Sequence, residues 1–599
     1  MKKFLPVLLI CACAFSCYGQ SADVARYAEF ARTYGVVRYF SPNPYVRKWS
    51  ESDWMKVCAL LAHRAEEQPL DVLFRPLAPA ATISDSPVPK ADADAADHAQ
   101  YCCHSGSGAL SVPLLAQLFY PGLGKYIPYY SKLETATGDP TADNAPTAGK
   151  YYAYPLSESK YLHIRHALPE EAFDRRATQQ LLADAAEFWN GHRYEDKNLP
   201  ARRRFLFGLL SDRAIRIADI TARWNIVRHF YPYYEEIDPE WERRLKPFLQ
   251  EAVRADRIAS LDAVFEWHRT VCRFFNPIKD GHLTVSTDMA VSGMKSAYLP
   301  EYYAPVSVLP VNDTVLVRDS SSPHAWRILR TIDGIPATER LREYADVSNA
   351  ATDEHRNRIA ASRLFVSPTF GTSFVIVSQE RSGSVRCDTL YAARPEPPRS
   401  DRHTEPFRKL ENGILYIDAA SDEATEKRFL AALTPDIKGL CFDLRSYPSY
   451  KFEEILAHLL AADSKAPATE VPIARYPFRQ LLAWRIEAET LPARSPRVSL
   501  PVTFLCDAGT FSWGETILLI VRHYRLGKIV GEPTAGTTGD LTRFELPIFP
   551  FSMTGMKMTG MDGEAHHAVG VMPDIVVPVF AADRMKGLDP ILQTALTCY

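Results

Sequence analysis

Residues 501–539 read PVTFLCDAGTFSWGETILLIVRHYRLGKIVGEPTAGTTG, and this stretch decides the fold of the C-terminal part of the chain. The apolar run Val502–Cys506 predicts a buried strand, and the residues after Ser512 predict an apolar helix. Ser512 therefore lies at a helix N-terminus, whose free N–H groups favour negative charge. A serine placed there is either a nucleophile, with the N–H of Trp513 as a candidate oxyanion donor, or a residue that caps the helix.

The alternation of strand and helix extends through residues 401–599. GILYIDAA (413–420) and IKGLCFDLR (437–445) predict two further strands, with helices beginning at Asp422 and Tyr450. Because all three strands are nearly all apolar, they predict a parallel sheet that is covered on both faces. The loops at the carboxyl ends of such strands are where an α/β sheet places its chemistry.

Residues 298–400 have a different pattern, with short alternating strands such as DTVLVRD (313–319) and TSFVIVSQ (372–379). The segment ILRTIDGIPATERLREY (328–344) predicts a strand, a tight Asp-Gly turn and a helix that begins at Ala337. These features resemble a PDZ-like peptide-binding domain.

An internal repeat marks the N-terminal half. VVRYFSP (36–42) and IVRHFYP (226–232) are each preceded by an aromatic residue and followed by a tryptophan. We expect duplicated helical modules at 20–70 and 206–297, although chance similarity between aromatic-rich helices is the alternative. Residues 71–205 contain a polar linker and are expected to form a small mixed α/β unit.

The composition is that of a globular protein. The chain has 599 residues, 46% of them hydrophobic and 24% charged, with a net charge of −3. These values exclude fibrous and fully disordered classes, and they provide no positive field for nucleic acid. Of the 11 cysteines, none has a CxxC spacing, and no HExxH motif occurs. We therefore expect neither a metal nor an organic cofactor. Cys441 and Cys506 are predicted to be buried free thiols.

The N-terminus MKKFLPVLLICACAFSCYG has the charged, apolar and small-residue regions of a secretory signal, in that order. We expect residues 1–19 to be removed and the mature protein to act in the periplasm or the extracellular space. Lipid attachment at Cys17 is the less favoured alternative. No later stretch is predicted to span a membrane.

Several separated motifs resemble the tail-specific and tricorn-type serine peptidase family. They are, in chain order, KDGHLTV (279–285), FDLRSYPS (442–449), T-x-S-x-x-E (510–515), G-E-x-T-x-G (531–536) and GVMPD (570–574). The resemblance covers about the second half of the chain. It implies a serine peptidase core with a crotonase-like α/β fold at 401–599, a PDZ-like domain at 298–400, and Ser512 as the nucleophile. The whole is expected to be a multidomain α+β protein.

The resemblance also allows two ways of activating the serine. The tail-specific type has a lysine where this chain has Thr537, so a serine–lysine pair is not expected. In the tricorn type the base is a histidine, which points to His282 in the DGH phrase, although a structural histidine after a turn is the alternative. That type also implies a glutamate linked to the histidine through a serine. Glu564 is the candidate, although it could equally be a solvated loop residue.

Two features concern the oxyanion and the helix after Ser512. Family members often have D-L-R-G-N-x-G-G, whereas residues 443–450 read DLRSYPSY, so the N–H of Ser449 is the expected second donor beside Trp513. The loss of the glycines argues for a weakened or inactive enzyme. Glu515 is expected to give structural support.

The leading hypothesis is a secreted serine peptidase that hydrolyses polypeptide substrates through Ser512 and His282. A catalytically inactive protein of the same fold, acting as a peptide-binding or scaffold module, is the alternative. An esterase-like hydrolase acting on glycan or peptidoglycan with the same serine is a third possibility.

Overall fold

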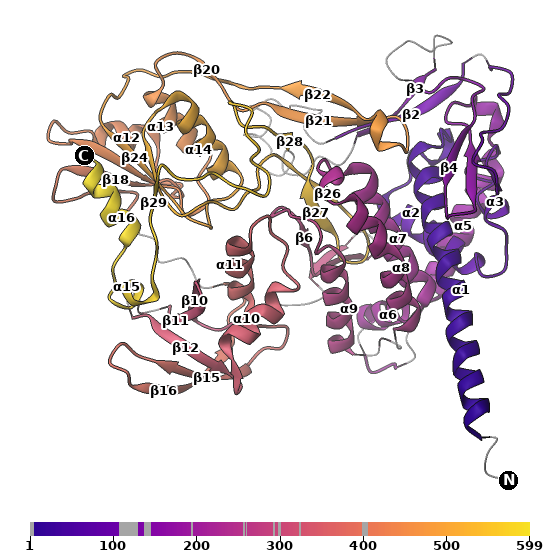
Figure 1. The fold of residues 1–599 in the computed structure, drawn as a ribbon, viewed down its shortest axis with the longest axis horizontal. Helices are drawn as coiled ribbons and strands as arrows, with labels where there is room; N and C mark the ends of the chain where they lie inside the picture. Colours follow the sequence, from indigo (N-terminus) through magenta and orange to yellow (C-terminus); the bar gives the residue numbers. More distant parts are fainter. Residues whose placement is uncertain are drawn as a thin grey trace.

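The computed structural model describes residues 5–599, except for 97, 107–129, 137–144, 193–195, 200, 256–257, 259, 292–293, 298–300, 321, 323–324 and 398–404. Three parts are seen in Figure 1: a helical lobe built mainly from the N-terminal half, a β domain, and a C-terminal α/β lobe. The mixed α and β composition predicted from the sequence is confirmed. No helix among the described residues is both long and apolar enough to cross a bilayer.

Helices form most of the N-terminal lobe. They are α1 (Leu5–Phe40), α2 (Glu51–Arg64), α3 (Leu70–Leu73), α5 (Arg175–Gly191), α6 (Ala201–Ser211), α7 (Arg213–Phe230), α8 (Asp238–Arg254) and α9 (Leu261–Phe274). A small antiparallel sheet in the order β1-β5-β4 packs beside them, from strands β1 (Thr82–Ser84), β4 (Tyr152–Pro155) and β5 (Tyr161–Ile164).

The two copies of the sequence repeat occupy equivalent places, the C-terminal ends of α1 and α7 and the two residues after each, and they pack against each other. The rings of Tyr39 and Phe230 are 4.7 Å apart, and those of Phe40 and His229 are 5.1 Å apart. The residues that the two copies share thus lie at the contact between the two helix ends, which buries aromatic surface.

A β arm joins the N-terminal lobe to the C-terminal lobe. Strands run in the order β22-β21-β2-β3, with β28 pairing to β21. They are β2 (Gln100–Ser105), β3 (Tyr130–Thr135), β21 (Thr469–Ala474), β22 (Ala483–Glu487) and β28 (Lys557–Met558). Figure 1 shows β21 and β22 reaching across from the C-terminal lobe to the strands of the N-terminal lobe.

The β domain is a curled antiparallel sheet in the order β10-β11-β12-β15-β16, with β13 paired to β12. Its elements are β9 (Tyr302–Tyr303), β10 (Val306–Val311), β11 (Thr314–Asp319), β12 (Arg327–Ile332), β13 (Ile335–Pro336), α10 (Ala337–Ala345), α11 (Asp353–Arg363), β14 (Val366–Ser367), β15 (Thr372–Gln379) and β16 (Val385–Ala392). Helix α11 lies between this sheet and the C-terminal lobe (Figure 1).

The C-terminal lobe has a six-stranded sheet in the order β17-β18-β19-β24-β25-β29, in which all neighbours from β18 onward are parallel. Its strands are β17 (Phe407–Lys409), β18 (Ile414–Asp418), β19 (Gly439–Asp443), β24 (Val502–Cys506), β25 (Lys528–Gly531) and β29 (Ile575–Val576). Its helices are α12 (Glu426–Ala432), α13 (Phe452–Leu456), α14 (Trp513–Tyr524), α15 (Ala581–Met585) and α16 (Pro590–Ala595).

Alternate residues of these strands point to opposite faces of the sheet, and both faces are covered. Phe442 and Phe504 pack with helices α12, α13 and α14 in one core. Tyr416 and Leu505 pack on the other face with α16 and with Leu316 of the β domain. The β domain is therefore seated on the sheet, next to the carboxyl ends of its strands. Cys441 and Cys506 are buried free thiols, as predicted.

Short strands complete the fold. β6 (Thr284–Val285), β26 (Leu541–Phe544) and β27 (Phe551–Thr554) form a sheet in the order β26-β27-β6, and β7 (Asp288–Val291) pairs with β8 (Met294–Ala297). β20 (Ser464–Lys465) pairs with β23 (Thr490–Leu491). The pairing of β6 with β27 brings the segment after α9 against the C-terminal lobe, and so positions the DGH phrase.

Candidate active site

Ser512 stands in a strained turn between β24 and α14. Its φ and ψ are 53° and −114°, a conformation that costs energy for any residue except glycine. The backbone N–H of Ser512 donates to Thr537 O at 2.9 Å, which ties the turn to the loop after β25. The side chain is buried. Strain of this kind persists only where the surroundings impose it, and it is concentrated at functional sites.

The ring of His282 contacts this serine, although the two residues are 230 positions apart in the sequence. His282 Nε2 lies 2.9 Å from Ser512 Oγ, and His282 Nδ1 lies 2.9 Å from Thr554 Oγ1. The Thr554 hydroxyl donates to Asp280 Oδ1 at 2.8 Å, so its oxygen is left to accept from His282. The proton of a neutral ring is therefore on Nδ1, and Nε2 is free to accept from the serine.

Asp280 is the buried carboxylate of this arrangement. It also accepts from the backbone N–H of His282 at 2.8 Å and from that of Thr554 at 2.7 Å. Burial lowers the pKa of His282, and the nearby carboxylates of Asp280, Asp540 and Glu515 oppose that shift. The ring is consequently neutral at pH 7, the state that a general base requires.

The N-terminus of α14 faces the serine. Among the described residues, no acceptor binds the backbone N–H of Trp513, the first residue of the helix. This N–H is one residue from Ser512 and carries the positive end of the helix dipole. It is placed as an oxyanion donor would be.

The sequence model described as Peptidase family S41 matches residues 413–577. This stretch belongs to peptidase family S41. Family membership supports a serine peptidase, that is, a hydrolase of peptides. Ser512 and Thr554 lie inside the S41 domain, whereas His282 and Asp280 come from outside the matched residues.

Comparison with single proteins gives distant likenesses. A Chlamydia pneumoniae protein, CPj1016/CpB1054, is 22% identical over 173 residues, which are 28% of this chain and 26% of that protein. The chain thus matches about a quarter of the length of this curated relative. Mature CPAF is 13% identical, with 62% of this chain and 94% of that chain covered at a TM-score of 0.46. The photosystem II D1 C-terminal processing protease is 13% identical, with 62% and 97% covered at a TM-score of 0.36.

The G-E-x-T-x-G loop of the S41 domain supports the turn at the nucleophile. The buried carboxylate of Glu515 accepts from Gly536 N at 2.7 Å, from Thr537 N at 2.8 Å and from the hydroxyl of Thr534. Thr537, which stands where the tail-specific type has lysine, accepts from Gly281 N at 2.9 Å through its hydroxyl. Glu515 therefore holds the loop, as expected, and Thr537 joins it to the DGH phrase.

Glu564 is not brought to His282. Its side chain is 73% exposed and its nearest ionic partner is Arg522, at 4.0 Å. The reason is a tight turn in which Gly563 N donates to Gly560 O at 2.9 Å and which leaves Glu564 on the surface. The expected arrangement was a glutamate linked to His282 through a serine. In the structure the carboxylate is that of Asp280, and the linking hydroxyl is that of Thr554.

Ser449 also departs from the expectation. Its backbone N–H donates to Ala419 O at 2.8 Å and its hydroxyl donates to Asp422 Oδ1 at 2.8 Å, so both donors are already used. Trp513 is thus the oxyanion donor that the structure leaves available of the two. Nearby, the phenol of the exposed Tyr447 also interacts with Ser512.

Sequence reasoning missed Asp280 and Thr554. Asp280 is part of the DGH phrase and could have been found there, whereas Thr554 lies in β27, in a segment without a motif. Among the residues that the structure describes, no group of three or more His, Cys, Asp or Glu side chains is arranged to hold a metal ion.

Proposed function

We propose that this protein is a serine peptidase that hydrolyses peptide bonds of polypeptides, with Ser512 as nucleophile and His282 as general base. The observation that carries the proposal is the 2.9 Å contact between Ser512 Oγ and His282 Nε2, with the opposite nitrogen of the ring held by Thr554. A nucleophile, a base and a group that orients the base are the parts that this chemistry requires.

The reaction follows from these positions. Ser512 Oγ bonds to the carbonyl carbon of the peptide while its proton passes to His282 Nε2. The N–H of Trp513 stabilises the negative oxygen of the tetrahedral intermediate. The imidazolium gives its proton to the leaving amine as the C–N bond breaks. A water molecule then attacks the acyl-enzyme with His282 again as base, which releases the carboxylic acid and restores the serine.

Asp280 and Thr554 are positioning residues in this scheme. Thr554 turns the His282 ring and fixes the tautomer with Nδ1 protonated. When the ring becomes an imidazolium, the negative charge of Asp280 stabilises it through the threonine hydroxyl, and Asp280 raises the pKa of His282.

A cavity between the β domain and the S41 domain is proposed to hold the polypeptide. Its volume is about 1200 Å³, and it is lined by β10, by α11 and by residues 576–580. It extends to Asp507 and Ala508, in the loop before Ser512, whereas Ser512 and His282 are not among its lining residues. Strand β10 is the terminal strand of its sheet, so its outer edge offers backbone groups to an extended chain. Addition of the substrate as a strand to β10 is the mode that this edge supports.

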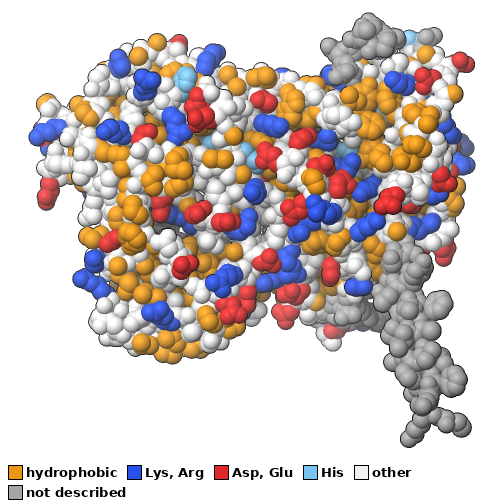
Figure 2. All heavy atoms as spheres, in the orientation of Figure 1, with side chains coloured by type: hydrophobic (Ala, Val, Ile, Leu, Met, Phe, Trp, Pro, Cys, Tyr) orange, Lys and Arg blue, Asp and Glu red, His pale blue; other side chains and the backbone are white. Residues whose placement is uncertain are grey.

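The surface charge is consistent with a polypeptide substrate. Figure 2 shows basic and acidic side chains interspersed over the face in view, as expected for a net charge of −3. A polyanion such as nucleic acid would need an extended region of one sign.

Hydrolysis and binding of an unfolded polypeptide such as casein test the proposal together. Ser512→Ala is expected to abolish cleavage and to leave the affinity for casein nearly unchanged. Ser464→Ala is the matched control, because among the described residues the hydroxyl of Ser464 bonds only to the backbone of Ala462. Cleavage by Ser512→Ala at the rate of the unaltered protein would overturn the assignment.

One observation favours a second candidate, a peptide-binding protein without catalysis. The backbone N–H groups of Trp513 and Ser449 were the two expected oxyanion donors. The N–H of Ser449 is already bonded to Ala419 O, so it is not available to an oxyanion. Under this alternative the unaltered protein binds casein and does not cleave it.

We also propose that the protein is exported from the cytoplasm. The support is that residues 1–19 have charged, apolar and small residues in the order of a secretory signal. N-terminal sequencing of the protein from its native host is expected to begin near Gln20. An intact Met1 in the mature protein would exclude the signal peptide.

A further inference from the structure

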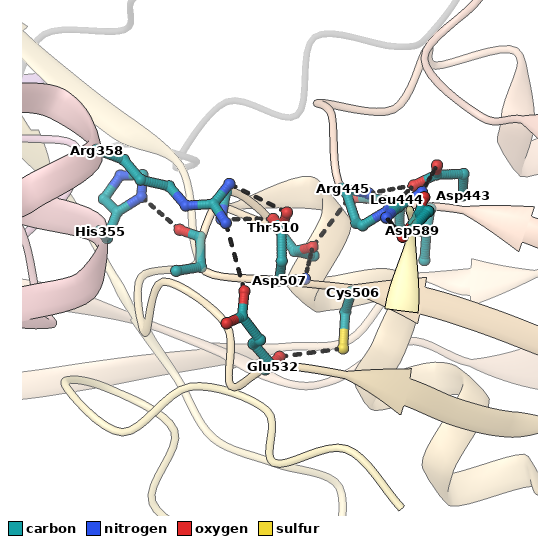
Figure 3. Close-up of polar contacts among 12 residues, drawn as sticks. His355, Arg358, Asp443, Leu444, Arg445, Cys506, Asp507, Thr510, Glu532 and Asp589 are labelled. Atoms are coloured by element: carbon teal, nitrogen blue, oxygen red, sulfur yellow. Dashed lines mark hydrogen bonds and ion pairs between the residues drawn. The ribbon is translucent and has the colours of Figure 1, made fainter. Parts of the chain in front are cut away.

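Helix α11 of the β domain reaches the loop that carries the nucleophile. His355 Nδ1 donates to Ala508 O at 2.8 Å, and Arg358 forms an ion pair of 3.0 Å with Asp507. Figure 3 shows both side chains pointing from the helix toward the end of β24. Ala508 and Asp507 lie in the loop from the end of β24 to Ser512, so a helix 153 residues away from Ala508 along the chain contacts the approach to the serine.

The ring of Phe511, the residue before Ser512, connects His355 with His282. The His355 ring stacks on Phe511 with centroids 5.2 Å apart and an interplanar angle of 11°. The His282 ring lies 4.8 Å from the same phenylalanine at 62°. A Cβ added at Gly281 would lie 2.7 Å from Phe511 Cε2, so the phenylalanine is packed closely against the DGH phrase.

We infer that His355 is a positioning residue for the reaction, and that α11 of the β domain completes the active site of the S41 domain. The inference rests on the proposed function. Ser512 has a strained backbone that would relax without external contacts. His355 supplies two such contacts to the same loop, a hydrogen bond to Ala508 and a ring stack on Phe511.

The protonation state of His355 suits this role. Burial lowers its pKa, so the ring is neutral at pH 7 and its single proton is on Nδ1, where Ala508 O accepts it. A neutral ring stacks on Phe511 without placing a positive charge near His282. His355 acts through Phe511 and the loop, since the contact with Ser512 Oγ is made by His282.

Three substitutions separate the two contacts. His355→Ala removes both, His355→Asn keeps a donor for Ala508, and His355→Phe keeps the ring on Phe511. We expect His355→Ala to lower kcat about 10- to 100-fold with KM changed less than about twofold, because loss of alignment acts on the chemical step. Each of the other two is expected to recover part of the loss. Asp353→Asn, on the same helix with a side chain 86% exposed, is the matched control.

A second readout does not depend on turnover. NMR of the protein labelled with ¹³C-histidine gives the titration midpoint of His282, assigned with His282→Asn. Burial is the main cause of the lowered pKa of His282, and the charge of His355 lowers it further. His355→Ala and His355→Phe both remove that charge, but only His355→Ala also removes the ring from Phe511. Opening of the loop is therefore expected to raise the midpoint in His355→Ala above the midpoint in His355→Phe. Asp353→Asn is expected to leave it unchanged.

The two readouts distinguish this inference from the proposed function. If the unaltered protein does not cleave casein and His355→Ala still has a higher His282 midpoint than His355→Phe, the proposed function fails, whereas the positioning of the loop beside His282 by His355 stands. The inference is overturned if folded His355→Ala has the same His282 midpoint as His355→Phe and, in a protein that cleaves casein, keeps kcat within about twofold. Where His355→Ala does not fold, His355→Asn, which also lacks the ring, takes its place in the comparison with His355→Phe.

Discussion

His282 Nδ1 donates to Thr554 Oγ1 at 2.9 Å, so a hydroxyl group lies between the ring and the carboxylate of Asp280. The hydroxyl in turn donates to Asp280 at 2.8 Å, and the chain of contacts from Ser512 ends on a carboxylate that is fully buried. Each of these three hydrogen bonds has one donor and one acceptor. Protons are therefore donated in one direction, from Ser512 toward Asp280.

Thr554→Val tests that chain. Valine has the same shape and no hydroxyl, so His282 Nδ1 loses its acceptor and Asp280 loses a donor. We expect kcat to fall about 10- to 100-fold and the free energy of unfolding to fall by about 1–3 kcal/mol. Steady-state hydrolysis and chemical denaturation measure the two effects. Thr554→Ser retains the hydroxyl and should remain close to the unaltered protein; equal activity of all three would contradict the role of the hydroxyl.

Gly281→Ala tests the packing of the DGH phrase. The added Cβ would lie 2.7 Å from Phe511 Cε2 and 3.2 Å from Thr537 Oγ1, so one of these groups has to move. Because Phe511 precedes the nucleophile, we expect the rate of casein cleavage to fall at least tenfold. Gly191→Ala meets no atom within 4 Å and serves as control. Full activity of Gly281→Ala would show that Phe511 is free to move without effect.

The pH dependence of cleavage should report His282. Its pKa is lowered by burial, so the neutral base is present at pH 7 and the acidic limb of kcat/KM is expected below pH 6.5. Asp280 raises this pKa, and Asp280→Asn should therefore move the limb to still lower pH. The measurement is kcat/KM from pH 4 to 8 for both proteins. A limb that moves upward in Asp280→Asn would contradict the assignment.

Stability should fall in acid because of buried histidines in the N-terminal lobe. Burial lowers the pKa of His104 and of His166 to about 4. The unfolded chain takes up these protons near pH 6.5, whereas the folded protein does so only near pH 4. The free energy of unfolding is therefore at its full value above pH 6.5 and declines as the pH falls toward 4.

Each of these two histidines is expected to cost about 3 kcal/mol once the pH is below 4. Urea unfolding at pH 7, 6 and 5 measures the decline. His166→Gln removes one of the titrating groups and should flatten the dependence. A free energy of unfolding that is constant between pH 7 and 5 would contradict the prediction.

The strands of the C-terminal sheet could be predicted because they are apolar on both faces. The runs around Ile414–Asp418, Gly439–Asp443 and Val502–Cys506 are all strands of the parallel sheet. The family resemblance, carried by separated motifs, is confirmed by the match at 413–577. Local composition and short motifs contain this information, since each depends on a few neighbouring residues.

Contacts between distant segments could not be predicted in the same way. Thr554 reaches His282 through the pairing of β27 with β6, across 272 residues of sequence, and a single threonine carries no signal for it. Glu564 was expected at the site by resemblance, and a turn at Gly560–Gly563 leaves it exposed. The backbone N–H of Ser449 donates to Ala419 O, at the end of the neighbouring strand β18. These two residues lie close together only in the folded sheet.

The central claim is that Ser512 is an activated nucleophile, and labelling with a fluorophosphonate probe tests it most directly. The account predicts that the unaltered protein is labelled, with Ser512→Ala and His282→Ala unlabelled under the same conditions. An active S41 peptidase serves as the positive control. Absence of labelling of the unaltered protein beside a labelled control, or equal labelling of Ser512→Ala, would contradict the account.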